Sequence, residues 1–190
     1  MADNQRHEHG VVWGRSACRL HHMSHPFVPD DFQAPSVLEG PGFHLEPLGP
    51  HHNDRDHEAW MSSIEWIRST PGYGPDTDWP ATMSSDANLR DLEMHARDFE
   101  NREGFTYSVL DGDAVIGCVY IYPTTESGFD ASIKSWVTAS RKEMDIVVHR
   151  SVARWINDFW PFDHARYAHR PDSSHDGERD RSKSGLVDTG

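Results

Sequence analysis

The stretch of residues 105–159 constrains the fold more than any other part of the chain. Two runs rich in β-branched and aromatic residues, 105–110 and 114–122, flank the sequence Asp111-Gly112-Asp113. Such runs are typical of β-strands, and the glycine suits a tight turn with positive φ. The sequence therefore predicts a β-hairpin in this region.

The second of these runs predicts a strand that is covered on both faces. Both of its alternating sets are largely apolar: Val115, Val119 and Ile121 on one side, and Ile116, Cys118, Tyr120 and Tyr122 on the other. A strand of this kind belongs in the middle of a sheet.

A third strand and a long helix follow the hairpin. Pro123 ends the second run, and residues 131–137 form the next strand-like segment. Apolar residues then recur at helical spacing from Met144 to Phe159, which predicts a helix with one continuous face to lay on the sheet.

The preceding part of the chain predicts one strand and two helices. Residues 42–48 read as a short strand, and Pro47 favours an edge position because proline gives the ladder no N–H. Helices are expected from about 53 to 69 and from about 84 to 102. On the second helix, His95 is expected at the surface.

Three segments are expected along the chain of 190 residues. We predict a disordered tail over 1–25, a single domain over 26–170, with a last short strand near 167–169, and a disordered tail over 171–190. Met23 is a candidate for the natural start. The histidines of the first tail lack the spacing of a zinc site, so no metal is expected.

Cellular setting and partners follow from composition. No apolar run is long enough to span a bilayer and no secretory signal opens the chain, so a cytoplasmic protein without a membrane partner is expected. The net charge is −13, with 16 acidic and 5 basic residues over 51–130 but 4 acidic and 7 basic over 131–170. This balance argues against nucleic acid and allows an anionic ligand in the second half.

The loop of residues 70–80 contains two large rings in a polar setting, Tyr73 and Trp79. They either cap the core or line the mouth of a substrate site. The sequence leaves both interpretations open.

The order strand, helix, helix, hairpin, strand, helix resembles the GNAT superfamily of acetyl-CoA-dependent N-acetyltransferases. The resemblance covers roughly residues 40–160, opens with Phe43-His44-Leu45-Glu46-Pro47-Leu48, and is closest to small bacterial members whose third strand matches 117–123. It implies an α+β fold with a mixed, mostly antiparallel central sheet flanked by helices. The usual C-terminal elements are missing, so the fold is expected to be truncated there.

The resemblance also implies where acetyl-CoA would bind. The strand that splays from its neighbour ends at Trp136 and Val137, and the following phosphate-binding turn matches 138–145. Its expected contacts are Thr138, Ser140, Arg141 and Lys142. The two glycine positions of that turn hold Glu143 and Asp145, whose carboxylates compete with a phosphate for the helix N-terminus.

The implied chemistry is acyl transfer from acetyl-CoA to a small-molecule or peptide amine, with a cationic amine favoured by the acidic half of the chain. Glu65 is the expected base, and Tyr120 and Tyr122 would line the pocket or relay protons. Tyr167 is the candidate for the general acid that the superfamily often places near the C-terminus. The ordinary alternatives are that Glu65 is a surface residue and that Tyr120 and Tyr122 are rings of the core or of the sheet cover.

Two functions therefore remain open from the sequence. The first is a GNAT-type N-acyltransferase with an unusual phosphate turn. The second is a catalytically inactive GNAT-like binding or interaction module, which could form a homodimer that completes the missing sheet edge.

Overall fold

A six-stranded sheet organises the molecule in the computed structural model, which describes residues 26–74 and 78–171. The strands lie in chain order, and each neighbouring pair is antiparallel except the last, β5 and β6, which is parallel. They are β1 (Leu38–Gly40), β2 (Phe43–Pro47), β3 (Phe105–Asp111), β4 (Ala114–Pro123), β5 (Ala131–Val137) and β6 (Ala165–Tyr167). The expected α+β layout is confirmed.

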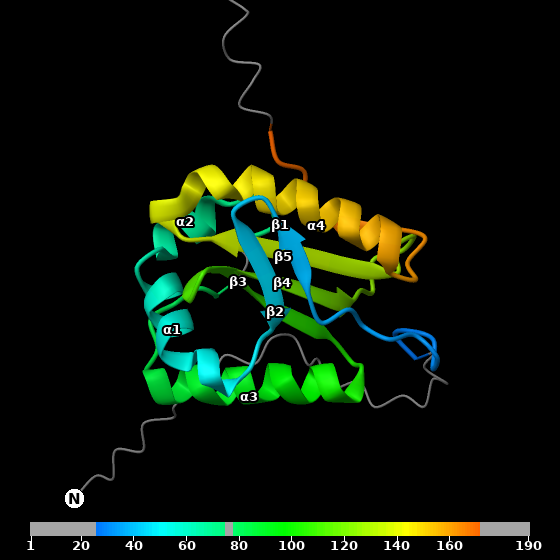
Figure 1. The fold of residues 1–190 in the computed structure, drawn as a ribbon, viewed down its shortest axis with the longest axis horizontal. Helices are drawn as coiled ribbons and strands as arrows, with labels where there is room; N and C mark the ends of the chain where they lie inside the picture. The colour runs from blue at the N-terminus through cyan, green and yellow to red at the C-terminus, as the bar shows by residue number, and fades with distance from the viewer. Residues whose placement is uncertain (1–25, 75–77, 172–190) are drawn as a thin grey trace, which may run out of the picture.

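Helices cover both faces of this sheet (Figure 1). The helix α4 (Asp145–Phe159) lies along one face, while α1 (Asn53–Met61), α2 (Ile64–Ser69) and α3 (Ser85–Asn101) lie on the other. Two short 3-10 helices precede α1 and α4: η1 (Pro50–His52) and η2 (Ala139–Met144). No helix among residues 26–74 and 78–171 is long and apolar enough to span a membrane.

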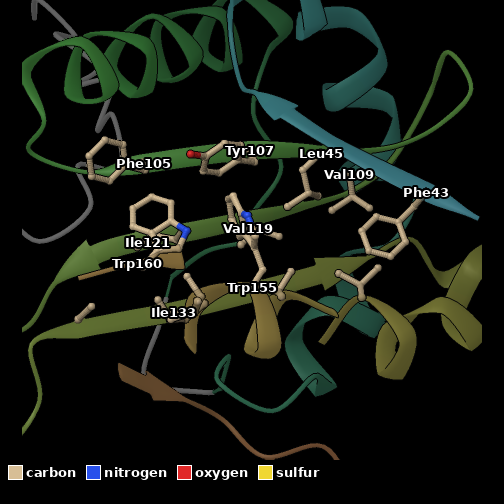
Figure 2. Close-up of a cluster of buried hydrophobic side chains, with 14 of the residues drawn as sticks. Phe43, Leu45, Phe105, Tyr107, Val109, Val119, Ile121, Ile133, Trp155 and Trp160 are labelled. Atoms are coloured by element: carbon tan, nitrogen blue, oxygen red, sulfur yellow. The ribbon is translucent and has the colours of Figure 1, made fainter. Parts of the chain in front are cut away.

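The first core cluster lies between the sheet and α4 (Figure 2). Its strand residues alternate along β3, β4 and β5, as period-2 patterning requires, and α4 contributes Val148, Val152 and Trp155. Trp160, which follows α4, is buried with them. Phe159 was expected on this buried face, but its side chain is 64% exposed because α4 ends there.

The second core cluster lies under α1, α2 and the loop that follows them. It joins Trp60 and Ile67 from the helices to Cys118 and Trp136 from the sheet. Tyr73 and Trp79 are buried in this cluster, as the core-capping interpretation required.

A β-bulge changes the expected face of two residues in β4. Val109 pairs with Gly117 and Leu110 pairs with Val115, so Ile116 is the extra residue. As a result Ile116 joins the first core cluster and Val115 the second, the reverse of simple alternation. β4 itself lies in the middle of the sheet with most of its residues buried, as expected.

The strand with Pro47 is not an edge strand, which corrects the sequence interpretation. β1, which belongs to a segment without a clear strand pattern, pairs outside it. Pro47 is the final residue of β2, where its missing N–H costs the ladder little.

The helix expected over 53–69 is broken into α1 and α2 at Ser62 and Ser63. The Ser63 hydroxyl accepts a hydrogen bond from the Ala139 N–H at 3.0 Å, which ties the break to the start of η2. The expected last strand forms slightly earlier, at β6. The predictions made for residues 1–25 and for the C-terminal tail beyond Pro171 lie outside the described residues.

Candidate functional site

The two parallel strands β5 and β6 pair over a short distance and then part. The last paired residues are Ile133 and Tyr167, whereas β5 continues to Val137. We call the region around Ser135, Tyr167 and Arg170 the β5–β6 junction. It corresponds to the place where the resemblance implied a splayed strand and the binding of acetyl-CoA.

The side chain of Arg170 fills this junction. It is 3% exposed, and its Nη2 donates to the Ser135 carbonyl oxygen at 3.0 Å. Its Nη1 donates to the carbonyls of Pro71 at 2.7 Å and Ala168 at 3.2 Å. Nε donates to Asp145 Oδ2 at 2.7 Å, in a charge-assisted bond of the strong kind. Arg170 thereby connects β5, the loop after α2 and the start of α4.

Two tyrosine hydroxyls lie beside Arg170. Tyr167 Oη is 2.5 Å from Ser135 Oγ, and its ring packs on His149 with centroids 4.1 Å apart. Burial raises the pKa of Tyr167, which keeps its hydroxyl protonated. The Tyr73 hydroxyl is buried without a hydrogen-bond partner among the described residues, and burial also raises the pKa of Tyr73 far above its usual range.

A buried hydroxyl without a partner is costly, and the Tyr73 hydroxyl has none among residues 26–74 and 78–171. The loop that carries Tyr73 meets the junction, because Arg170 donates to the Pro71 carbonyl and Lys134 Nζ of β5 lies 5.8 Å from the centroid of the Tyr73 ring. Tyr73 therefore lies near the junction.

The turn before α4 does not have the form of a phosphate-wrapping loop. Residues 139–144 form η2, with Arg141 at a non-helical φ of −126° and ψ of 30°. Arg141 Nη1 binds Asp111 Oδ2 at 2.5 Å and its Nε binds Glu143 Oε1 at 3.2 Å, which raises the pKa of Arg141. Lys142 is exposed.

The other residues expected at the cofactor are mostly internal. Trp136 and Val137 are fully buried, one in each core cluster. Thr138 is also buried, and its Oγ1 lies 3.2 Å from the hydroxyl of the exposed Ser140. Side chains at these positions thus support the strand and the turn.

Tyr120 belongs to an aromatic cluster within the second core. Its hydroxyl accepts a hydrogen bond from Trp136 Nε1 at 3.3 Å, and its ring centroid lies 6.2 Å from that of Trp79. Trp79 in turn contacts the rings of Trp60, Tyr73 and Trp136. Burial raises the pKa of Tyr120 well above its usual range, so its phenol can donate a proton but does not act as a base at neutral pH.

Tyr122 belongs to a hydrogen-bond network under α3. Its hydroxyl donates to Asp98 Oδ2 at 3.1 Å and lies 2.7 Å from His95 Nδ1. Since the phenol has one proton, His95 Nδ1 is the donor in that second bond. Burial lowers the pKa of His95 to about 4, so the ring is neutral at pH 7.

The structure corrects the expectation for His95, which is buried against the sheet and not on the solvent face. The pairing of Tyr122 with Ser132 places Tyr122 away from the part of β5 that leaves β6. Both tyrosine rings nevertheless contact the same imidazole, since the centroid of His95 lies 5.6 Å from that of Tyr120 and 6.0 Å from that of Tyr122. Their assignment to a substrate pocket stays a prediction.

Glu65 is exposed on α2, whose inward residue is Ile67. Among the described residues it makes no hydrogen bond or ion pair. Its assignment as the base therefore stays a prediction.

A cluster of Glu46, His51 and His52 has its ligand atoms within 4.8 Å of one another. The Gly49 N–H donates to His52 Nδ1 at 3.2 Å, so the proton of the neutral ring is on Nε2, which lies 2.6 Å from Glu46 Oε1. That proton occupies the position a metal would need. The hydrogen bond to His52 lowers the pKa of Glu46, and burial lowers that of His52.

Sequence reasoning missed Arg170 and gave Tyr73 no polar role. No local pattern marks a lone arginine between a strand and a proline, and a tyrosine in a loop gives no sign of which hydroxyl will lack a partner. Tyr167 was found because the resemblance directed attention to a tyrosine near this position.

Comparisons with known proteins gave structural matches alone. No protein-family profile matches the sequence, and no curated protein matches it. The fold is similar to that of ribosomal-protein-S5-alanine acetyltransferase from Vibrio fischeri, at 14% identity and a TM-score of 0.47, over 63% of this chain and 66% of that one. At this identity the likeness is one of backbone layout.

Two further similar structures contain ligands. One is RimL, a ribosomal L7/L12 α-N-protein acetyltransferase in complex with coenzyme A: 12% identity, TM-score 0.49, 63% of this chain and 67% of that one. The other is the microcin C7 self-immunity acetyltransferase MccE in complex with acetyl-CoA and AMP. The match has 15% identity and a TM-score of 0.48, and it covers 66% of this chain and 67% of that one. The chain spans about two thirds of the length of the solved structures it matches.

Proposed function

We propose that this protein is an acyl-CoA-dependent N-acyltransferase that transfers an acetyl group from acetyl-CoA to an amine. The β5–β6 junction carries this proposal. There the Ser135 carbonyl accepts an N–H of Arg170, which also binds the Pro71 carbonyl in the loop that carries Tyr73. The Tyr73 hydroxyl has no partner among the described residues.

Two features of the junction fit the thioester end of acetyl-CoA. The Ser135 carbonyl now accepts from Arg170, and a pantetheine amide N–H is a donor of the same kind. The Tyr73 hydroxyl would gain a partner from a thioester carbonyl oxygen. Because the pKa of Tyr73 is high, this hydroxyl stays protonated and would stabilise negative charge that develops on that oxygen.

The phosphate end fits less well. Glu143 and Asp145 stand at the two expected glycine positions, and Arg141 is held by Asp111. The exposed Lys142 is the cation available to a phosphate outside the turn. Arg170 must also leave the Ser135 carbonyl before a pantetheine amide can bind there.

Acetyl-CoA, when bound, supplies a thioester whose acyl carbon is attacked by the amine nitrogen while the thiolate leaves. Glu65 is proposed to accept the amine proton, and its exposure lets it pass that proton to water. Tyr167, kept protonated by burial, is proposed to donate to the leaving thiolate. The excess of acidic residues over 51–130 favours a cationic small-molecule or peptide amine as the acceptor.

A second function, a binding module without catalysis, is favoured by one observation. Arg170 satisfies Ser135, Pro71 and Asp145 at once, so the chain itself occupies the place of the donor arm. In this alternative the junction is a permanent structural contact.

Calorimetric titration of acetyl-CoA separates the two functions. We expect the wild-type protein to bind acetyl-CoA, and the double variant Arg170→Ala/Asp145→Asn to bind it at least about tenfold more tightly. Arg170 no longer competes with acetyl-CoA for Ser135 in this variant. A tenfold change corresponds to about 1.4 kcal/mol, which is comparable to one charge-assisted hydrogen bond. The Asp145→Asn change avoids an unpaired buried carboxylate. Arg141→Ala/Lys142→Ala should weaken binding, whereas Arg90→Ala, on exposed α3 surface, should not.

If neither the wild type nor the double variant binds while circular dichroism shows an intact fold, the transferase proposal is wrong and the binding module is favoured. Equal affinity of the wild type and the double variant would show that acetyl-CoA does not compete with Arg170.

The base is tested separately with Glu65→Gln. Loss of a general base lowers kcat by about 10²-fold or more, while the affinity for acetyl-CoA should not change. Coenzyme A release is measured with a cationic amine as acceptor, and Glu58→Gln, an exposed residue of α1, is the matched control. Unchanged kcat in Glu65→Gln would remove Glu65 from the mechanism.

A further inference from the structure

Two large apolar side chains are exposed, one just before β1 and one at the end of α4. Among the described residues, Val37 is 51% exposed and Phe159 is 64% exposed, and no other large hydrophobic residue is exposed. A groove of about 410 Å³ between β1 and α4 is lined by Leu38, Glu39 and Phe159 among others. Val37 does not line the groove but directly precedes Leu38 in the chain. Exposed apolar surface at a sheet edge indicates an interaction site.

Among residues 26–74 and 78–171, no strand pairs with the outer edge of β1, which lies at this groove. Gly40 pairs with Phe43 across the two-residue turn Pro41-Gly42, so these two residues form the hydrogen-bonded pair that closes the hairpin. Hydrogen-bonded and non-hydrogen-bonded positions alternate along an antiparallel pair. The N–H and C=O of Glu39, and by continuation those of Val37, therefore point away from β2.

The charges at the groove are balanced, although the chain as a whole carries −13. Two acidic residues, Glu39 and Asp158, and two basic residues, Arg150 and Arg154, line it. A surface with equal numbers of both signs can face a copy of itself, whereas most of this acidic surface would repel one.

We infer that the groove is the interface of a homodimer in which β1 of one copy pairs antiparallel with β1 of a second copy around Leu38. In this register Val37 lies opposite Glu39 of the other copy, and each such pair exchanges both of its N–H···O bonds. No like charges stand opposite each other on the strands. Both copies use the same surface in this contact, so the assembly is complete with two copies.

The pairing suits a second copy better than an unrelated strand. The outward-pointing positions Val37 and Glu39 are spaced symmetrically about Leu38, so each is complementary to the other in a two-fold arrangement. The pairing would join the two sheets through their β1 edges and bring the exposed Val37 and Phe159 of each copy toward the partner. This inference does not depend on the proposed transferase activity.

Sedimentation velocity of the full chain over a wide concentration range tests the inference. We expect the wild type to reach the mass of two chains and Glu39→Pro to remain at the mass of one. Proline at position 39 removes an outward N–H and leaves the β1–β2 bonds of Leu38 and Gly40 in place. Glu39→Ala, which keeps the N–H, is the matched control and should still form dimers.

Hydrogen exchange of the Glu39 amide provides a second measurement on the wild type. Its exchange should slow as the protein concentration rises. A wild type that stays monomeric, or a Glu39→Pro variant that associates as well as Glu39→Ala, would overturn the inference. Protection of the amide at all concentrations in a monomer would also overturn it, since another segment of the chain would then cover the edge.

Discussion

Asp56 shows what a single buried carboxyl does to this fold. It is 4% exposed and accepts a hydrogen bond from Asn88 Nδ2 at 3.1 Å, while Asn88 Oδ1 accepts from Trp60 Nε1 at 2.9 Å. Burial raises the pKa of Asp56 from 3.8 to about 6. The carboxylate is therefore poorly stabilised at neutral pH, although its hydrogen bond positions α1 against α3.

We expect Asp56→Asn to stabilise the protein at pH 7. A group with a raised folded-state pKa contributes stability that is present below about 3.8 and is lost as pH rises through about 6. The neutral amide avoids that loss. The gain in the free energy of unfolding is at most about 3 kcal/mol, from 1.36 kcal/mol per pKa unit.

Urea unfolding from pH 4 to pH 8 measures this difference. The stability of Asp56→Asn minus that of the wild type should grow from about pH 4 to about pH 6 and level off above it. Asp54→Asn, at an exposed neighbour, is the comparison variant. A difference that does not change with pH would show that Asp56 is not protonated in the folded protein near pH 5.

At the scale of the elements, β4 depends on a glycine. A Cβ on Gly117 would lie 2.2 Å from the Trp136 carbonyl oxygen of β5. The obstacle is main chain, so it cannot turn aside as a flexible side chain could.

Gly117→Ala is expected to lower the free energy of unfolding by about 3 kcal/mol, the upper end of the range for overpacking. Gly74→Ala is the matched control, because a Cβ there meets nothing within 4 Å, and its effect should stay within about 0.5 kcal/mol. Thermal unfolding of both variants gives the comparison. Equal melting temperatures would contradict the close approach of β4 and β5.

The elements with strong periodicity were predictable from the sequence, and the irregular ones were not. β3, β4 and β5 form where β-branched residues cluster, and Ser84 caps α3 through a bond to the Ala87 N–H at 3.2 Å. The bulge at Ile116 was hidden because both faces of β4 are apolar, so a shift of one residue leaves the pattern unchanged.

The site was less predictable than the fold because it depends on tertiary contacts. Arg102 follows Asp98 by four residues, but it donates to the Phe32 carbonyl at 2.7 Å, while Asp98 accepts from Tyr122. Tyr167 was named from the sequence, but its closeness to Ser135 depends on where β6 pairs. Local spacing cannot reveal either arrangement.

At the scale of the whole molecule, the two proposed sites lie at opposite edges of one sheet. β1 is the first strand and β6 the last in the strand order. Association through β1 and binding at the β5–β6 junction should thus be independent.

We expect Glu39→Pro to bind acetyl-CoA with the same affinity as the wild type, and Arg170→Ala/Asp145→Asn to associate as the wild type does. Calorimetry measures the affinity of each variant for acetyl-CoA, and sedimentation velocity measures its association. Loss of both properties in one variant would show that the two edges are coupled through the sheet.

The aromatic cluster of the second core gives the protein an optical signature of its own. Trp79 lies with its ring centroid 6.1 Å from Trp60 and 6.2 Å from Trp136, at interplanar angles of 44° and 48°. Indoles this close and tilted couple their electronic transitions, so they contribute an exciton signal to circular dichroism. Since Tyr73 contacts Trp79, movement at the β5–β6 junction would alter that signal without any added label.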